Sequence, residues 1–358
     1  MESLRLMHVF PDLHGGGTED VILKLSDYIY GHTNAVIGIC ATAEGGLRKS
    51  DFEELNIEIF DIPHFQNKKK LGQNLLKIKK SLSLFKPDIV HTHSLYSLIL
   101  VYLARKISRL NYRIVHTGHG GPQENYDELA KKYFWMADAY VTISKYSYDY
   151  LSNASKKEHV HLIYNGTTEP PLNEVVQLKQ NYDTLKLAFV GRVVRQKGLS
   201  VLIDAVHLLS LKGYKVSLDV VGDGELLESL KKKVDEKKLT DSVHFLGFLK
   251  QPWSKITDCP VVVVPSLWEP GGLVAIEAIL RDHTVVASST GGLKDRIKSG
   301  SNGYLFDVED AEGLANQLMN IFDNDAYIHL THEEKKAYVF KEDSGPSYLQ
   351  LYDELLKS

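Results

Sequence analysis

Short apolar runs alternate along this chain with longer segments in which apolar residues recur every three to four positions. The first pattern is typical of buried strands and the second of helices, so their alternation predicts strand–helix units that build parallel sheets. In the first half the expected strands are residues 4–10, 35–40, 57–62, 88–91, 113–116, 139–143 and 160–163. In the second half they are residues 186–190, 216–221, 243–246, 261–264, 284–287 and 304–306.

The alternation breaks once, at residues 165–183, where Asn-Gly, Pro-Pro and mixed polar residues have no consistent period. A chain of 358 residues is long enough for two domains. We therefore expect α/β domains at 1–170 and 180–343, followed by a helix at 344–358. Because strands such as 261–264 are apolar on both faces, each sheet is expected to be doubly wound, with a ligand site at the carboxyl ends of its strands.

Composition and charge exclude several classes of protein. With 43% hydrophobic and 25% charged residues, the chain is neither disordered nor fibrous. The net charge of -4 lacks the basic footprint of a nucleic-acid-binding protein. The two cysteines are far apart and predict buried thiols, and no run of about 18 apolar residues is present, so a cytoplasmic location is expected.

A glycine-rich turn, residues 14–17, follows the first expected strand and precedes a helix. The backbone N–H groups of Gly16 and Gly17 could approach a phosphate at the start of that helix. Plain turn chemistry explains the same residues equally well.

A cationic loop follows the first expected strand of the second half, where Arg192, Arg195 and Lys197 lie within six residues. Arginine forks and a lysine charge beside a helix start suit a diphosphate. The alternative is a solvated basic loop.

The segment at 265–278 combines two acids with a glycine pair. Glu269 lies in a loop, Gly271 and Gly272 expose backbone N–H groups before Leu273 and Val274, and Glu277 lies about one turn into the next helix. Carboxylate oxygens suit the vicinal hydroxyls of a sugar or ribose. Alternatively, the acids only complement the helix dipole.

Histidines end two neighbouring expected strands: His91 and His93 on one, His116 and His119 on the next. A metal site is the obvious alternative, but no carboxylate or cysteine of ligand spacing accompanies them. We expect no metal, and histidines that bind polar ligands or cap strands.

Residues 64–86 contain seven lysines and no acid. Apolar positions there form one helical stripe: Leu71, Leu75, Ile78, Leu82 and Phe85. A basic amphipathic helix can lie on an anionic membrane, whereas a helix packed on the core with a solvated basic face has the same pattern.

Taken in order, these motifs resemble the family 4 retaining glycosyltransferases of the GT-B fold over essentially the whole chain. The most specific piece, Glu269 to Glu277, fits the E-x7-E pattern of that family. The supporting pieces are Gly16-Gly17-Thr18-Glu19, His91-Thr92-His93, His119, Asn165-Gly166, Gly191-Arg192, Lys197-Gly198, Gly222-Asp223-Gly224, Phe245-Leu246-Gly247 and Gly291-Gly292.

The resemblance implies two Rossmann-like domains facing across a cleft, the first for the acceptor and the second for a nucleotide sugar. It assigns the diphosphate to Arg192 and Lys197, the sugar hydroxyls to Glu269 and the ribose to Glu277. Residues 271–274, with Gly16 and Gly17 from the first domain, would line the donor. His119 would lie at the reacting centre, with His91 and His93 on the acceptor side, and no metal or cofactor would be needed.

The implied reaction moves a sugar from a UDP- or GDP-linked donor to a hydroxyl of a glycan or glycolipid, in assembly of cell-envelope polysaccharide or lipopolysaccharide. The location would be cytoplasmic, with residues 64–86 as a contact to the inner face of the membrane. The alternatives are a nucleotide-sugar 2-epimerase of the same fold and a two-lobed sugar-binding protein. The cationic loop argues against the latter, because a plain sugar needs no diphosphate site.

Overall fold

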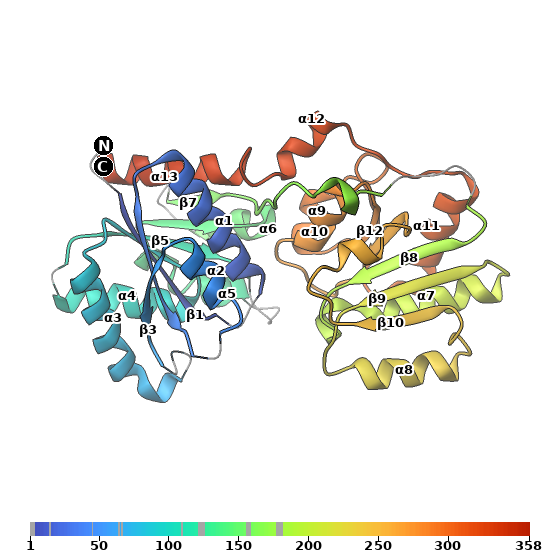
Figure 1. The fold of residues 1–358 in the computed structure, drawn as a ribbon, viewed down its shortest axis with the longest axis horizontal. Coiled ribbons are helices and arrows are strands. Elements are labelled where there is room, and N and C mark those ends of the chain that lie inside the picture. Colours follow the sequence, from blue (N-terminus) through green and yellow to red (C-terminus); the bar gives the residue numbers. More distant parts are fainter. Residues whose placement is uncertain are drawn as a thin grey trace. The chain divides into compact units, whose positions relative to one another are not determined.

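The computed structural model describes residues 4–13, 16–44, 46–63, 65, 67–108, 110–120, 126–154, 159–176 and 182–358. The chain forms two compact units (Figure 1). Unit 1 contains Met1–Thr168 and Val339–Ser358, and unit 2 contains Glu169–Tyr338. The chain therefore leaves unit 1 two residues before the expected boundary and returns to it five residues before the expected terminal helix.

Unit 1 is built on a parallel sheet of seven strands in the order β3-β2-β1-β4-β5-β6-β7. Every expected strand of the first half forms, with ends within two residues of the prediction. The strands are β1 (Arg5–Asp12), β2 (Val36–Thr42), β3 (Glu58–Asp61), β4 (Ile89–Thr92), β5 (Arg113–Gly118), β6 (Ala139–Thr142) and β7 (Val160–Leu162).

Unit 2 is built on a parallel sheet of six strands in the order β10-β9-β8-β11-β12-β13. Their ends lie within one residue of the prediction. The strands are β8 (Leu185–Val190), β9 (Val216–Val221), β10 (Val243–Gly247), β11 (Val261–Val264), β12 (Thr284–Ser288) and β13 (Tyr304–Phe306).

Helices connect the strands in both units. In unit 1 they are α1 (Gly17–His32), α2 (Lys49–Glu54), α3 (Leu71–Phe85), α4 (Leu95–Ser108), α5 (Tyr126–Ala130), α6 (Lys145–Ala154) and α13 (Ser344–Lys357). In unit 2 they are α7 (Leu199–Leu211), α8 (Leu227–Glu236), α9 (Leu273–Leu280), α10 (Gly291–Arg296), α11 (Ala311–Asp323) and α12 (His332–Lys335). Short 3-10 turns add η1 (Lys68–Lys70), η2 (Phe134–Met136), η3 (Leu172–Glu174), η4 (Arg195–Lys197), η5 (Trp253–Lys255) and η6 (Lys336–Tyr338).

Alternate side chains of the central strands of unit 2 belong to different hydrophobic clusters. Val261 and Val263 of β11 pack with residues of α7 and α11, whereas Val262 and Val264 pack with residues of α9 and α10. Successive side chains of a strand point to opposite faces. Helices therefore cover both faces of this sheet, as the unbroken valine run predicts.

The strand order reverses direction once in each sheet. In unit 1 the chain proceeds outward from β1 to β3 and then resumes at β4 on the other side of β1; in unit 2 the same switch lies between β8 and β11. Ligands of doubly wound sheets bind beyond the carboxyl ends of the strands at such a point. The cationic loop and the acidic loop predicted from sequence follow β8 and β11.

The last helix, α13, packs onto unit 1. Tyr348, Leu351 and Tyr352 are buried on one of its faces, as their spacing predicts. Gly345 lies against α1, where an added Cβ would be 2.7 Å from Cγ of Tyr28. Unit 1 thus combines the sheet of Arg5–Leu162 with a helix from the segment that follows unit 2.

The apolar stripe of α3 is directed into unit 1. Ile78, Leu82 and Phe85 are buried in the core cluster of this unit, and Leu75 packs against it. From Leu75 to Phe85 the stripe therefore packs on the core of unit 1, whereas Leu71, at the start of α3, is 43% exposed. His64 and Gln66 of the basic segment lie outside the described residues.

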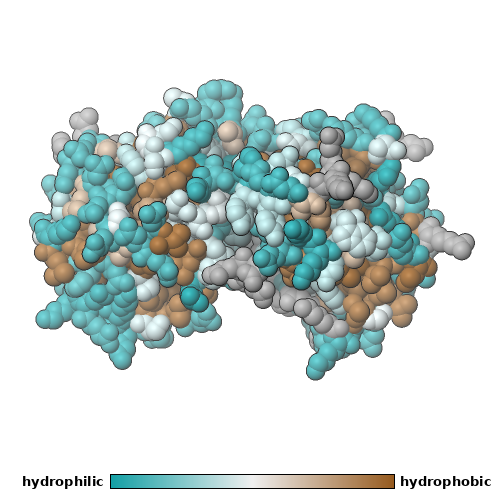
Figure 2. Space-filling view, turned by 180° about the vertical axis from the view of Figure 1, so that it is seen from behind, coloured by the Kyte–Doolittle hydropathy of each residue, from teal (hydrophilic) through white to brown (hydrophobic). Residues whose placement is uncertain are grey.

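No helix among the described residues is long and apolar enough to cross a membrane. Figure 2 shows one face of the molecule, on which hydrophilic residues predominate and hydrophobic ones form separate patches.

Candidate active site

The loop after β8 is interlocked with the loop after β9 through the backbone. The N–H of Gly191 donates to the carbonyl of Val221 at 3.0 Å, and that of Val193 donates to the carbonyl of Asp223 at 2.8 Å. A Cβ on Gly222 would lie 1.8 Å from the carbonyl oxygen of Gly191. Only glycine fits there, so the cationic loop has a fixed path from the sheet.

The cationic loop ends at Gly198, which precedes α7 with a φ of +64°. A Cβ at this position would lie 1.9 Å from the carbonyl oxygen of Pro265, in the loop after β11. A backbone hydrogen bond joins the same two loops: Leu267 N–H donates to the carbonyl of Gln196 at 2.8 Å. The missing side chain of Gly198 therefore lets the two switch-point loops contact each other.

Lys197 and Glu269 form an ion pair where these loops meet. The distance from Nζ to Oε2 is 2.6 Å, and the side chains are 17% and 11% exposed. The hydroxyl of Ser266 donates to the same oxygen, Oε2, at 3.2 Å. Glu269 is thus held by two donors, and Oε1 is the oxygen that neither of them uses.

The N-terminus of α9 lies directly after this acid. Gly272, with a φ of +66°, is the N-cap residue and has no side chain to offer to the first-turn N–H groups. These groups have no carbonyl acceptor within their own helix, so the helix start can bind an anion. Glu277 is the fifth residue of α9 and is half-buried.

Two glycines at the start of α10 fix the backbone of the acidic loop. Gly292 N–H donates to the carbonyl of Glu269 at 2.8 Å. A Cβ on Gly291 would lie 2.4 Å from the carbonyl oxygen of Glu269, and one on Gly292 would lie 2.3 Å from that of Pro270. The Gly-Gly pair noted in the sequence thus positions the loop that carries the acid.

Other predicted donor residues are also at the carboxyl ends of strands. Arg192 is exposed in the loop after β8. In unit 1, Gly16 and Gly17 are exposed at the start of α1, and Glu19 folds back so that Oε2 would lie 3.2 Å from a Cβ on Gly16. His14 and Gly15 of the same turn lie outside the described residues.

The histidines of unit 1 form two hydrogen-bonded groups. In the first, Nδ1 of His8 lies 2.9 Å from Nε2 of His93, and Nδ1 of His93 lies 2.9 Å from Nε2 of His119. In the second, His91 contacts the hydroxyls of Tyr352 at 2.6 Å and of Thr117 at 2.7 Å.

The ring of His91 is therefore not available to an acceptor substrate, contrary to the sequence-based expectation. It is 0% exposed, and both ring nitrogens are used to hold α13 and β5. His93 is 5% exposed and also uses both nitrogens. Of the three residues placed on the acceptor side, His119 alone is partly exposed.

Burial keeps these imidazoles neutral. It lowers the pKa of His8 to about 3, that of His116 to about 3 and that of His119 to about 4. The pKa values of His91 and His93 are also well below 6.5, because of burial first and of the neighbouring histidines second.

One group of histidines, His8, His91 and His93, brings ring nitrogens within 4.8 Å of one another. Such a group could hold a metal ion. Five of its six ring nitrogens are already hydrogen-bonded, however, and Nε2 of His8 is the one without a partner among the described residues. A metal would have to break these bonds, so the group fits a hydrogen-bond network better.

Comparison with known families decides the identity of the chain. The model for Glycosyltransferase Family 4 matches residues 15–168, and the model for Glycosyl transferases group 1 matches residues 173–338. The chain belongs to glycosyltransferase family 4.

This glycosyltransferase is 25% identical over 317 residues to an uncharacterized 41.2 kDa protein in the cps region of Klebsiella pneumoniae, a match that covers 80% of the chain and 84% of that protein. Among solved structures, Anabaena HepE in complex with UDP and glucose matches with a TM-score of 0.77 and 21% identity, over 99% of this chain and 100% of that one. The lipopolysaccharide outer core galactosyltransferase WaaB matches with a TM-score of 0.80 and 16% identity, over 98% and 100%. The GT-B fold expected from the motifs is confirmed.

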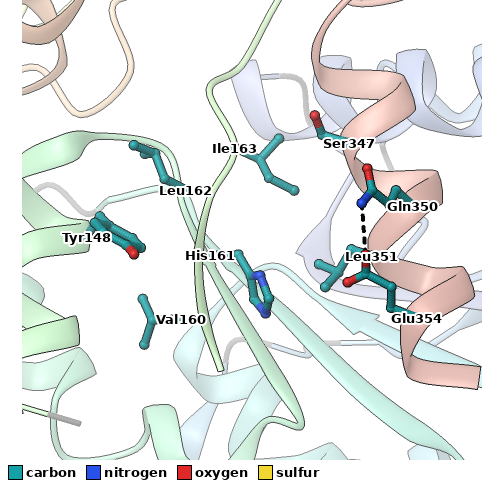
Figure 3. Close-up of a pocket in the computed structure, with 9 residues that line it drawn as sticks. All are labelled: Tyr148, Val160, His161, Leu162, Ile163, Ser347, Gln350, Leu351 and Glu354. Atoms are coloured by element: carbon teal, nitrogen blue, oxygen red, sulfur yellow. Dashed lines mark hydrogen bonds between the residues drawn. The ribbon is translucent and has the colours of Figure 1, made fainter. Parts of the chain in front are cut away.

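Two grooves of the glycosyltransferase lie away from the predicted site residues. One, of about 490 Å³, runs between β7 and α13 in unit 1 and is lined by His161 and Glu354 (Figure 3). Gln350 donates to Glu354 there at 2.8 Å, and burial lowers the pKa of His161. The other, of about 430 Å³ in unit 2, includes Lys186 and Asp258, which pair with each other.

Sequence reasoning missed three residues: Ser266 and Gly198 beside the Lys197–Glu269 pair of unit 2, and His8 in the histidine group of unit 1. Ser266 lies in the segment at 265–278, but the sequence assigns it no role; in the structure its hydroxyl donates to Glu269. Gly198 gave no signal of its close approach to Pro265, since that contact is between segments far apart in sequence. The sequence does contain one signal for His8, because it is a polar residue in the middle of an apolar strand.

Proposed function

We propose that this glycosyltransferase moves a sugar from a UDP- or GDP-linked donor to a hydroxyl of a glycan or glycolipid acceptor, with retention at the anomeric carbon and without a metal ion. The observation that carries the proposal is the meeting of Lys197, Glu269 and Ser266 where the loops after β8 and β11 touch. A cation, a fixed carboxylate and a helix start at one switch point suit a nucleotide sugar.

Each member of this group has a distinct role in the proposal. Departure of a nucleoside diphosphate builds negative charge, which Arg192, Lys197 and the first-turn N–H groups of α9 stabilise. Glu269 orients Lys197 through Oε2 and accepts a sugar hydroxyl with Oε1. Glu277, one turn into α9, takes the ribose.

Relatives support the donor and the setting. Anabaena HepE is described with UDP and glucose, which favours a UDP-linked donor. The relative in the cps region of Klebsiella pneumoniae and the lipopolysaccharide galactosyltransferase favour cell-envelope assembly. We place the reaction in the cytoplasm, where nucleotide sugars are the donors.

Thermal-shift measurements with UDP, GDP and a panel of their sugar conjugates test the donor. A ligand at 100 times its dissociation constant stabilises the folded state by about 2.7 kcal/mol. We expect a clear shift for UDP-glucose or a related UDP-sugar, and the same shift after EDTA treatment. A flat response across all UDP- and GDP-linked compounds would overturn the proposal.

Product analysis separates the transferase from its rivals. Incubating the donor alone should give no epimer, whereas a 2-epimerase would convert it. With cell-envelope glycan fractions as acceptors, NMR of the product should show the anomeric configuration of the donor. Binding without any consumption of donor would favour a sugar-binding protein instead.

A second part of the proposal concerns the outward face of α3. Leu76 and Leu84 are 64% and 65% exposed there, and Lys77 and Lys80 are exposed beside them. Exposed leucines among lysines suit a surface of anionic lipid. We propose that this face meets the inner membrane, where a lipid-linked acceptor would lie.

Co-sedimentation with phosphatidylglycerol vesicles tests this surface. Replacing Lys77 and Lys80 by Glu should reduce the bound fraction strongly, because each basic residue near the surface is worth about 1 kcal/mol. The matched control replaces Lys231 and Lys232, the exposed or half-exposed lysines of α8 in unit 2. Equal loss in both variants would show general charge attraction and contradict a specific surface on α3.

A further inference from the structure

Three imidazoles lead from the interior of the unit 1 sheet to its carboxyl edge. His8 is fully buried in β1, His93 follows β4 and is 5% exposed, and His119 follows β5 and is partly exposed. β1 pairs with β4, and β4 pairs with β5. Hydrogen bonds of 2.9 Å join His8 to His93 and His93 to His119.

The middle residue, His93, gives the two hydrogen bonds of this row of histidines a common direction. A neutral imidazole has one N–H donor and one acceptor nitrogen, and His93 uses both nitrogens within the chain. If His93 accepts from His8, it must donate to His119; if it accepts from His119, it must donate to His8. The three rings therefore share one tautomer, with the proton on Nδ1 in the first case and on Nε2 in the second.

The inner end of the chain selects between these two cases. Nε2 of His8 is buried and has no hydrogen-bond partner within the described ranges. In the second case this atom would be a buried N–H without an acceptor, whereas in the first it is a lone pair without a donor. Among backbone groups, buried N–H donors without an acceptor are rarer than buried acceptors without a donor, and the same preference applies to the imidazole nitrogens. The first case is therefore favoured.

We infer that His8 and His93 are positioning residues that lock His119 as a neutral imidazole with its proton on Nδ1, so that it can donate a hydrogen bond to a sugar oxygen but cannot accept a proton there. The lock is a property of unit 1 by itself, while its use on a sugar rests on the proposed function. Burial lowers the pKa values of the three rings and so disfavours the imidazolium form. An imidazolium would donate from both nitrogens, and the hydrogen bonds would no longer all run from His8 to His119.

Among the described residues, the neighbouring polar groups add no further hydrogen bond to the row of His8, His93 and His119. His91 is held by Tyr352 and Thr117, and Nδ1 of His116 lies 2.8 Å from the hydroxyl of Thr92. The ring of His91 lies against those of His8 and His93, with centroids 5.3 and 4.2 Å apart, but among the described residues neither His91 nor His116 hydrogen-bonds to the three linked histidines. His116 is consequently a matched control, since it is equally buried but outside the chain.

Nitrogen-15 NMR of the full-length protein labelled at histidine reads each tautomer directly. At pH 7.5, without any ligand, we expect His119 as the Nδ1-protonated form. In His8→Phe and His93→Leu this form should give way to a mixture, and in His116→Phe it should persist. An Nε2-protonated His119 in the wild type, or a tautomer unmoved by both replacements, would overturn the lock.

Kinetics with the donor found by thermal shift then test the use of the lock. His93→Leu should lower kcat about 10-fold with little change in the donor KM, as expected when the support of a site residue is lost. His93→Gln should recover most of this loss, because its amide can accept from His8 and donate to His119. If the wild type consumes no donor, the proposed function fails while the NMR result still decides the lock.

Discussion

At Gly198 a hydrogen atom is all that fits between the start of α7 and the carbonyl of Pro265. We predict that Gly198→Ala displaces Lys197 and abolishes detectable donor binding, because the Cβ would lie 1.9 Å from that oxygen. Gly213→Ala is the control: its φ is +86°, but no atom of the described residues lies within 4 Å of an added Cβ. It should cost about 1 kcal/mol from backbone strain alone and leave UDP binding intact, as measured by calorimetry.

Lys197 and Glu269 should behave as one unit toward the donor. Lys197→Ala removes a charge-assisted contact worth about 1.5 to 3 kcal/mol, so turnover should fall about 10- to 100-fold. Lys186→Ala, which removes the Lys186–Asp258 ion pair of unit 2, should leave turnover unchanged. Equal effects of the two replacements would count against a donor site at Lys197.

A double-mutant cycle sharpens the same point. Lys197 and Glu269 are 2.6 Å apart and mostly buried, so removing either one leaves the other without its partner. The loss in Lys197→Ala/Glu269→Gln should therefore be smaller than the sum of the single losses. Additive losses in kcat/KM would show that the residues act separately.

At the scale of elements, the sequence specified the strands far better than the contacts between them. Unbroken apolar runs such as Val261–Val264 are typical of buried parallel strands, and they form strands where expected. The face of α3 could not be assigned from spacing alone, because a stripe packed on a sheet and a stripe lying on a membrane share one period. Burial of Ile78 and Leu82 decides it.

The role of His91 and the pairing of Lys197 with Glu269 were beyond sequence reasoning for a related reason. His91 bonds Tyr352, which is 261 positions away, so no local pattern reports it. The ion pair of Lys197 and Glu269 joins two loops predicted as separate parts of a donor site. Motif matching located both loops, but their contact depends on the strand order, in which β11 is placed beside β8.

The anchoring of α13 leads to a stability prediction. Tyr352→Phe removes the hydroxyl bonded to Nδ1 of His91 and leaves a buried polar atom unpaired, which should cost about 1 to 3 kcal/mol. Tyr146→Phe is the control, because Tyr146 is 64% exposed. Urea unfolding of both variants would measure the difference, and equal midpoints would show that the hydroxyl contributes nothing.

For the whole molecule, mild acid should weaken unit 1 before unit 2. Among the described residues, histidines with a lowered pKa are six in unit 1 and one, His283, in unit 2. Each has a folded pKa below its unfolded value of about 6.5, so its contribution is intact above pH 6.5 and is lost as pH falls toward the folded value. The loss is about 1.4 kcal/mol per pH unit for each group in that window.

Hydrogen exchange read by mass spectrometry can follow the two units separately in the intact chain. Between pH 7 and pH 5, after correction for the intrinsic exchange rate, protection should fall in β1, β4 and β5 and change less in β8 and β11. A uniform loss, or an earlier loss in unit 2, would contradict the assignment of neutral buried histidines to unit 1.

The division of unit 1 between the two ends of the chain also sets an order of events during synthesis. All of Glu169–Tyr338 leaves the ribosome before α13 does, so unit 2 can finish folding while unit 1 still lacks its last helix. Domains usually fold from the N-terminus as they emerge. Here unit 1 still lacks a helix at that stage, and His91 and Thr117 lack the hydroxyls of Tyr352 and Tyr348 until α13 has emerged.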